Sequence, residues 1–191
     1  MKSMKAGEIF MKTCVILCGG KSSRFGSDKA LFPFRGHPSM THFLFSRLSR
    51  EFERVFACAK SSKFNPPLPM IYDEFEEFSP MGALYSALKP FSGERIFIIP
   101  ADMPFVEIST IHALSEQEGQ ICVAGDEAHR HSLCGFFDAA LAPRALELYR
   151  AGEHKIGALI DRVNFKVLNF KNKEQFLNIN YQNDLKGVDE I

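Results

Sequence analysis

The chain has 191 residues, 46% of them apolar, which is the usual size of one domain and suits a soluble globular protein. Lysine plus arginine and aspartate plus glutamate each number 23, so the net charge of zero favours neither nucleic acid nor an anionic membrane as a partner. Five cysteines without a C-x-x-C pair argue against a disulfide framework or a thiolate zinc site. The sequence has no apolar run of signal-peptide or membrane-spanning length. Together these observations predict that the protein is located in a reducing cytoplasm.

The first two thirds of the chain predict a repeated strand and helix pattern. Residues 13–18 are a short apolar run closed by paired glycines, which is typical of a strand buried on both faces of a parallel sheet. Apolar residues at three- and four-residue spacing predict a helix from about 38 to 48, and a strand follows at 55–59. The pattern then recurs, with strands at 69–72, 95–100 and 121–124 and helices at about 81–88 and 108–118.

The last third continues with helices at 140–150 and about 155–161, a strand near 166–170 and a segment at 176–180 without an assigned element. This alternation predicts a Rossmann-like α/β fold with three layers, α/β/α, and a mostly parallel sheet. No internal repeat or linker interrupts the pattern, so residues 11–191 are expected to form a single domain and residues 1–10 an extension without an assigned function. Ligands bind such sheets beyond the carboxyl ends of the strands.

A glycine-rich segment directly follows the first predicted strand and reads Gly19-Gly20-Lys21-Ser22-Ser23-Arg24-Phe25-Gly26-Ser27-Asp28-Lys29. Glycines let backbone amides approach a polyphosphate closely, and Arg24 and Lys29 add positive charge. The spacing excludes a P-loop, which has four residues between its glycines, and the G-x-G-x-x-G dinucleotide fingerprint. A glycine-rich turn with surface cations is the simpler alternative, but the clustering behind a buried strand favours phosphate binding.

Two aspartates follow predicted buried strands. Asp102 could hold Mg²⁺, which takes oxygen ligands and links them to substrate phosphates, or it could cap the next helix or turn. Asp73 could accept hydrogen bonds from a ribose or a guanine ring, but it also begins an acidic stretch, so a solvated turn is the alternative. The pair His129-x-His131 lacks an evident third metal ligand, and we interpret both histidines and the cysteines as structural, or at most peripheral to the cofactor site.

Residues 17–31 resemble the signature of the molybdenum cofactor guanylyltransferases, roughly L-A-G-G-x-S-x-R-M-G-x-D-K-A-L, with Cys18 and Phe25 replacing the usual alanine and methionine. Residues 79–83 resemble G-P-L-A-G, and residues 101–105 resemble C-D-M-P-F. Residues 131–134, His-Ser-Leu-Cys, correspond to a block in which the family usually has proline. Residues 176–185 are similar to the closing F-x-N-I-N-T-P-x-D-L. The first block alone indicates only the wider family that activates sugars and alcohols with nucleoside triphosphates. The closing block, with its asparagines, narrows the resemblance to the molybdenum cofactor guanylyltransferases.

This resemblance implies a nucleotidyltransferase fold and an enzyme that transfers GMP from GTP to molybdopterin, or to the molybdenum-loaded cofactor, with Mg²⁺. It implies that Asp102 binds the metal, that Asn178 and Asn180 lie on the pterin side, and that GTP is bound by Leu17, Cys18, Gly19, Gly20, Lys29, Asp73 and Asp102. An asparagine usual in the family is replaced around Ala59-Lys60, which affects part of the guanosine contact. Delivery of an unstable cofactor would also favour transient contacts with cofactor-synthesis proteins or apoenzymes.

In the implied reaction the terminal phosphate of the pterin cofactor attacks the α-phosphorus of GTP and pyrophosphate leaves. A phosphate monoester has a second pKa of about 6. The attacking oxygen is therefore mostly ionised at neutral pH, and the reaction needs no general base to remove its proton. Two like unit charges about 4 Å apart repel by about 4 kcal/mol at an effective dielectric of about 20. Because both substrates carry negatively charged phosphates, we expect Arg24, Lys29 and Asp102 with its metal to act catalytically by neutralising that charge. The alternatives are a related nucleotidyltransferase acting on a sugar phosphate or alcohol, and a non-catalytic guanine-nucleotide-binding protein that delivers the cofactor.

Overall fold

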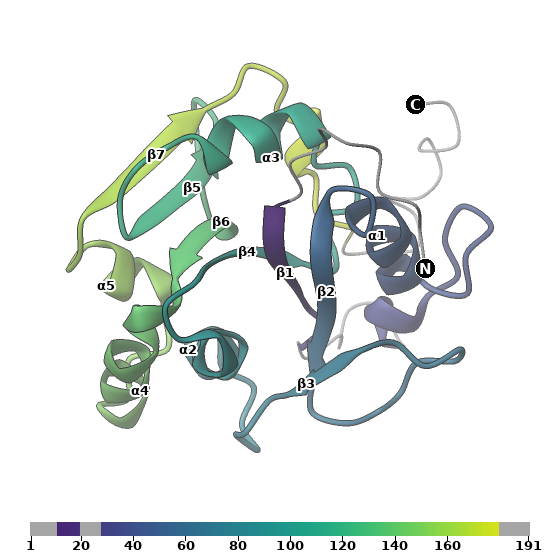
Figure 1. Cartoon of the computed structure of the whole chain (residues 1–191), viewed down its shortest axis with the longest axis horizontal. Coiled ribbons are helices and arrows are strands. Elements are labelled where there is room, and N and C mark those ends of the chain that lie inside the picture. The colour runs from purple at the N-terminus through teal and green to yellow at the C-terminus, as the bar shows by residue number, and fades with distance from the viewer. Residues whose placement is uncertain (1–10, 20–27, 180–191) are drawn as a thin grey trace.

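The computed structural model describes residues 11–19 and 28–179, which form one seven-stranded sheet with helices on both faces (Figure 1). The strands are β1 (Met11–Leu17), β2 (Phe52–Ala59), β3 (Met70–Tyr72), β4 (Arg95–Pro100), β5 (Ile121–Gly125), β6 (Arg130–Asp138) and β7 (Phe165–Asn169). The α-helices are α1 (Met40–Leu48), α2 (Pro80–Leu88), α3 (Ile108–Ser115), α4 (Ala142–Arg150) and α5 (Ile156–Ile160). Short 3-10 helices are η1 (Lys29–Leu31), η2 (Lys89–Phe91), η3 (Ala139–Leu141) and η4 (Glu174–Phe176). The predicted three-layer α/β/α fold is confirmed.

The strand order is β3-β2-β1-β4-β6-β5-β7, and every strand except β6 runs in the same direction. Strand β6 was not predicted from the sequence, because its first half is polar and gives no continuous apolar run. Only four residues, 126–129, connect β5 to β6, which is too short for a crossover and produces an antiparallel pair. Gly135 is required within β6, since a Cβ there would lie 2.2 Å from the carbonyl oxygen of Cys122.

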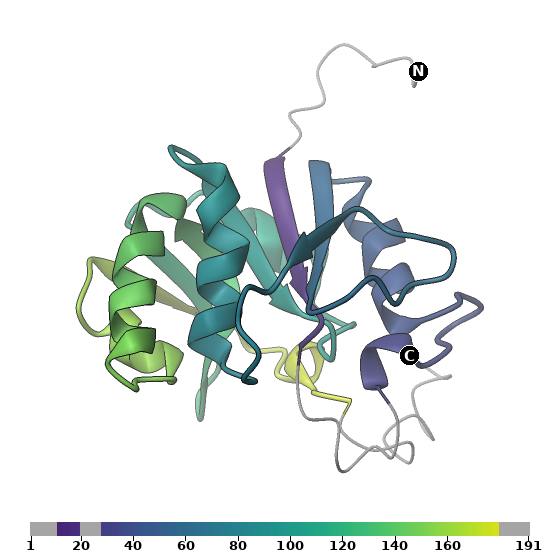
Figure 2. The ribbon, with the colours of Figure 1, turned by 90° about the horizontal axis from the view of Figure 1, so that it is seen from below.

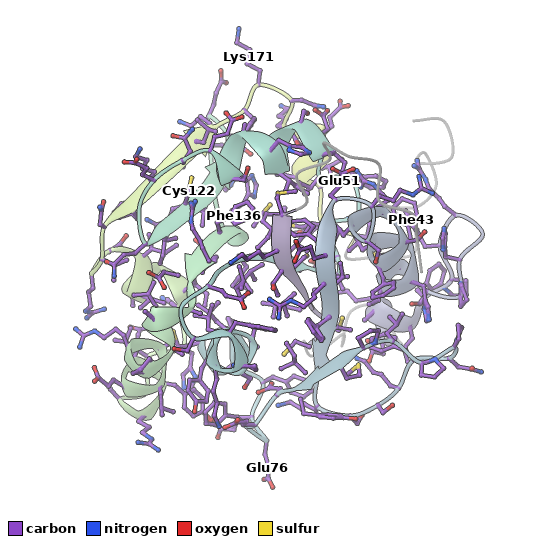
Figure 3. All side chains as sticks on the ribbon, in the orientation of Figure 1. Phe43, Glu51, Glu76, Cys122, Phe136 and Lys171 are labelled. Carbon is purple, nitrogen blue, oxygen red and sulfur yellow. The ribbon has the colours of Figure 1, made fainter. Side chains whose placement is uncertain are left out.

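The central strand β1 is buried on both faces, as its sequence predicts. Cys14 and Ile16 pack in one apolar cluster with residues of α1 and α3, whereas Val15 and Leu17 pack in a second cluster with residues of α2, α4 and α5. Figure 2 shows α2 and α4 side by side on their face of the sheet. Figure 3 shows Phe136 inside the molecule, while Glu76 and Lys171 point outward.

The helix ends follow local hydrogen bonding. Ser39 and Ser79 cap α1 and α2, each accepting a backbone N–H with its hydroxyl oxygen. Helix α3 ends at Ser115, before the predicted limit of 118, and Gly119 follows with a φ of +123°. Helix α4 begins later than predicted because residues 139–141 form η3. Across the described part of the chain, every helix is too short or too polar to span a membrane.

Candidate functional site

A cavity of about 1030 Å³ lies at the carboxyl ends of β1 and β4. Its walls come from segments far apart in the sequence, namely residues 17–19 at the end of β1, residues 100–103 at the end of β4 and residues 130–133 of β6. Asp73 and Asn178 also line it. The cavity therefore lies at the edge of the sheet where the sequence analysis expected ligands.

Lys29 and Asp102 face each other in the wall of this cavity. The Asp28 carboxylate accepts a hydrogen bond from the Ala30 backbone N–H at 3.1 Å and thereby begins η1. From η1 the Lys29 ammonium group forms an ion pair with the Asp102 carboxylate, and the two side chains are 21% and 17% exposed. Asp102 does not cap the following helix, because the N-cap of α3 is Glu107. The pair is thus partly shielded from water and accessible from the cavity.

Lys63 links the two ends of the glycine-rich segment. Its ammonium group donates a hydrogen bond to the carbonyl oxygen of Cys18 at 3.0 Å and forms an ion pair with the Asp28 carboxylate. Lys63 was not predicted as a site residue, because it lies in the polar turn after β2 and belongs to no motif. A single side chain therefore fixes the end of β1 relative to the start of η1.

Asp73 lines the cavity, but its carboxylate is engaged by the protein. Only 5% of the side chain is exposed, and it accepts a hydrogen bond from the Phe75 backbone N–H at 3.2 Å. The Ser86 hydroxyl lies 3.3 Å from one oxygen, and the Lys60 ammonium lies 3.2 Å from the other. The carboxylate is therefore not in a solvated turn. Lys60, which lies near the position where the family resemblance would place an asparagine, forms an ion pair with Asp73 and holds it in place.

Strand β6 contributes His131 to the cavity wall. The imidazole Nε2 lies 3.0 Å from the Asp126 carboxylate, and the ring stacks on Phe176 with centroids 4.3 Å apart. Backbone N–H groups of Ala128 and His129, together with His131, lower the pKa of Asp126 to about 2. A carboxylate that is ionised at neutral pH thus orients His131, whereas the side chain of His129 is 76% exposed. The described ranges contain no cluster of three or more His, Cys, Asp or Glu side chains that could hold a metal.

Asn178 reaches the cavity because the chain near it is attached to the loop after β4. The backbone N–H of Ile179 donates a hydrogen bond to the Asp102 carbonyl oxygen at 2.9 Å. Phe176, two residues before Asn178, is buried against His131. The closing block and the loop that carries Asp102 are therefore held together. Gly20, Arg24 and Asn180 lie outside the described residues.

The cysteines are buried, and Cys18 meets the cavity next to Leu17 and Gly19. Its thiol lies 3.6 Å from the Thr41 hydroxyl and 3.4 Å from the Ile16 carbonyl oxygen. Burial raises the pKa of the Cys18 thiol to about 12, and it does the same for Cys134. These thiols are therefore protonated at neutral pH and are poor nucleophiles.

Two kinds of sequence comparison agree with this geometry. A family model for the MobA-like NTP transferase domain matches residues 14–167. The chain is 39% identical over 173 residues to the molybdenum cofactor guanylyltransferase of Campylobacter jejuni subsp. doylei, covering 88% of this chain and 90% of that protein. It is 28% identical to the molybdenum cofactor guanylyltransferase of Helicobacter pylori strain 26695 over 185 residues, covering 93% and 92%.

The fold is also that of solved structures. The molybdopterin-guanine dinucleotide biosynthesis protein A of Archaeoglobus fulgidus superposes with a TM-score of 0.78 at 20% identity, covering 94% of this chain and 97% of that one. At this identity the likeness concerns the fold alone, whereas the match to the Campylobacter protein covers most of both sequences. The chain therefore belongs to the molybdenum cofactor guanylyltransferase family and contains a MobA-like NTP transferase domain.

Proposed function

We propose that this protein transfers GMP from GTP to molybdopterin, or to the molybdenum-loaded cofactor, and releases pyrophosphate. One observation supports this most strongly: a single cavity is lined by the end of β1, by the Lys29–Asp102 pair and by Asn178. The described residues for which the family resemblance implies phosphate binding, charge neutralisation and contact with the acceptor all line this cavity, which supports the proposal.

The triphosphate is proposed to bind along residues 17–20 and Lys29, where backbone amides and an ammonium group can offset its charge. Gly20 and Arg24, which lie outside the described residues, keep the roles implied by the family resemblance. Asp73 is proposed to act on the nucleoside side, within a corner that Lys60 and Ser86 hold together.

Enzymes of this family use a divalent metal ion, which we propose to be Mg²⁺. Mg²⁺ is usually held by one or two carboxylates together with substrate phosphates and water, so the carboxylate of Asp102, which is partly exposed in the cavity wall, fits as its protein ligand. When bound, the ion would supply charge neutralisation to the triphosphate. Lys29 would then be able to contact a phosphate oxygen as well as Asp102.

The pterin cofactor is proposed to bind on the side of the cavity formed by His131 and Asn178, with Asn180 contributing from outside the described residues. The attacking phosphate is already ionised at neutral pH, so the protein needs to orient it and offset its charge. Arg130, which pairs with Asp161, and Lys155 line the same cavity, and Lys155 would add positive charge. Transient contacts with cofactor-synthesis proteins or apoenzymes are proposed for delivery of the product.

The deciding experiment measures pyrophosphate release from purified protein with Mg²⁺ and molybdopterin, using GTP, CTP, ATP and UTP in turn. Release with GTP alone is expected. Release only with a sugar phosphate or alcohol as acceptor would instead identify the related nucleotidyltransferase. Tight GTP binding without release when molybdopterin is present would identify a delivery protein.

A further inference from the structure

Phe78 is a large apolar side chain that is exposed inside the cavity. It is 49% exposed and lines the wall beside Ser79 and Ala83. Most large apolar side chains of the described residues are buried in the two clusters that flank the sheet. An aromatic ring held open in a cavity offers a flat surface on which a planar ligand can stack.

Lys60 holds this ring in its exposed position. Its ammonium group lies 4.9 Å from the centroid of the Phe78 ring, within the range of a cation–π contact. The same group donates hydrogen bonds to the carbonyl oxygens of Phe75 and Glu77, the latter at 3.0 Å, and pairs with Asp73. The backbone just before Phe78 is therefore fixed, which limits how far the ring can turn away from the cavity.

The polar groups beside Phe78 are engaged within the protein. The Ser79 hydroxyl oxygen caps α2 by accepting the Gly82 backbone N–H, and it also lies 2.8 Å from His154 Nδ1. The Asp73 carboxylate contacts Lys60, Ser86 and a backbone N–H. The ring of Phe78 is thus the surface that this corner offers most openly to a ligand.

We propose that Phe78 is a stacking platform for the fused nitrogen heterocycle of a substrate and that Lys60 is its positioning residue. This inference rests on the proposed function, in which both substrates carry such a ring system: guanine in GTP and the pterin in the acceptor. Stacking recognises the flat face of either ring, and selectivity between them comes from the groups at its edges.

The test compares Phe78→Leu, which keeps an apolar side chain, with Phe78→Tyr, which keeps the ring. Binding of GTP and of inorganic tripolyphosphate is measured by calorimetry with Mg²⁺, and KM for molybdopterin is measured by pyrophosphate release. The matched control is Phe165→Leu, because Phe165 is 38% exposed and has the Arg130 guanidinium 5.7 Å from its ring centroid but does not line the cavity. Thermal unfolding checks that each variant is folded.

If guanine stacks on Phe78, Phe78→Leu weakens GTP binding about tenfold and leaves tripolyphosphate binding unchanged. If the pterin stacks there, the variant leaves GTP binding unchanged and raises KM for molybdopterin about tenfold. In both cases Phe78→Tyr and Phe165→Leu resemble the wild type. Unchanged constants in Phe78→Leu, or equal losses in Phe78→Leu and Phe78→Tyr, would overturn the proposal. Comparing GTP with tripolyphosphate needs no turnover, so its outcome is separate from that of the proposed transfer reaction.

Discussion

Lys29, on η1, forms an ion pair with Asp102, which follows β4, and the two residues meet across the wall of the cavity. The pairing places an ammonium group and a carboxylate where a polyphosphate and its metal ion have to be bound together. Because both side chains are partly exposed, we expect the pair to contribute about 1 kcal/mol to folding stability. Substitution of either residue is therefore expected to affect ligand binding and catalysis more than the fold.

Asp102→Asn is expected to reduce pyrophosphate release by about 10³-fold or more, because the amide keeps the shape of the side chain but loses the charge that holds Mg²⁺. The thermal unfolding midpoint should change by only a few degrees, or less, since the ion pair adds about 1 kcal/mol or less. Initial rates at saturating GTP and Mg²⁺ measure the effect. Near-normal turnover with Mg²⁺ would remove Asp102 as the metal ligand.

Lys29→Ala is expected to raise the dissociation constant for GTP about 10- to 100-fold, which is the usual effect of losing a charge-assisted contact to phosphate. The control is Lys89→Ala, because Lys89 also pairs with a carboxylate, that of Glu74, but is exposed and lies outside the cavity lining. Calorimetric titration of both variants distinguishes a local role from a change in net charge. Equal affinities for the two variants would count against a phosphate contact by Lys29.

The sequence predicted the edge of the sheet at which Lys29 and Asp102 meet, because buried strands that end in polar residues are readily recognised and parallel strands share one carboxyl edge. It did not predict β6, whose polar first half brings Arg130 and His131 to the cavity. It also did not predict the contacts of Lys60 and Lys63, since a long side chain in a turn can reach several partners and the fold decides which. The pairing of β6 and the ion pairs of Lys60 and Lys63 join residues that are far apart in the sequence or lie in turns, so local sequence patterns could not predict them.

Asp126→Asn is expected to destabilise the protein in a way that depends on pH. Backbone N–H groups and His131 lower the pKa of Asp126 to about 2, below its ordinary value of 3.8. A carboxyl group whose pKa is lower in the folded state stabilises the fold above its unfolded pKa, and this contribution is lost as the pH falls through the folded value. The difference in urea midpoint between wild type and variant should therefore shrink from pH 5 towards pH 2, as followed by circular dichroism. A difference that stays constant over this range would contradict the lowered pKa.

Lys63→Met is expected to weaken GTP binding without removing any group that touches the nucleotide. The substitution leaves the Cys18 carbonyl oxygen and the Asp28 carboxylate without their shared cation, so the two ends of the glycine-rich segment are no longer tied together. We expect KM for GTP to rise about tenfold with a smaller change in kcat, because holding Cys18 and Asp28 in their binding positions would then cost more conformational entropy. Lys63→Arg, which can still donate to both oxygens, should recover most of the affinity. If Lys63→Met lowered kcat and left KM unchanged, Lys63 would act on the chemical step rather than on the binding of the triphosphate.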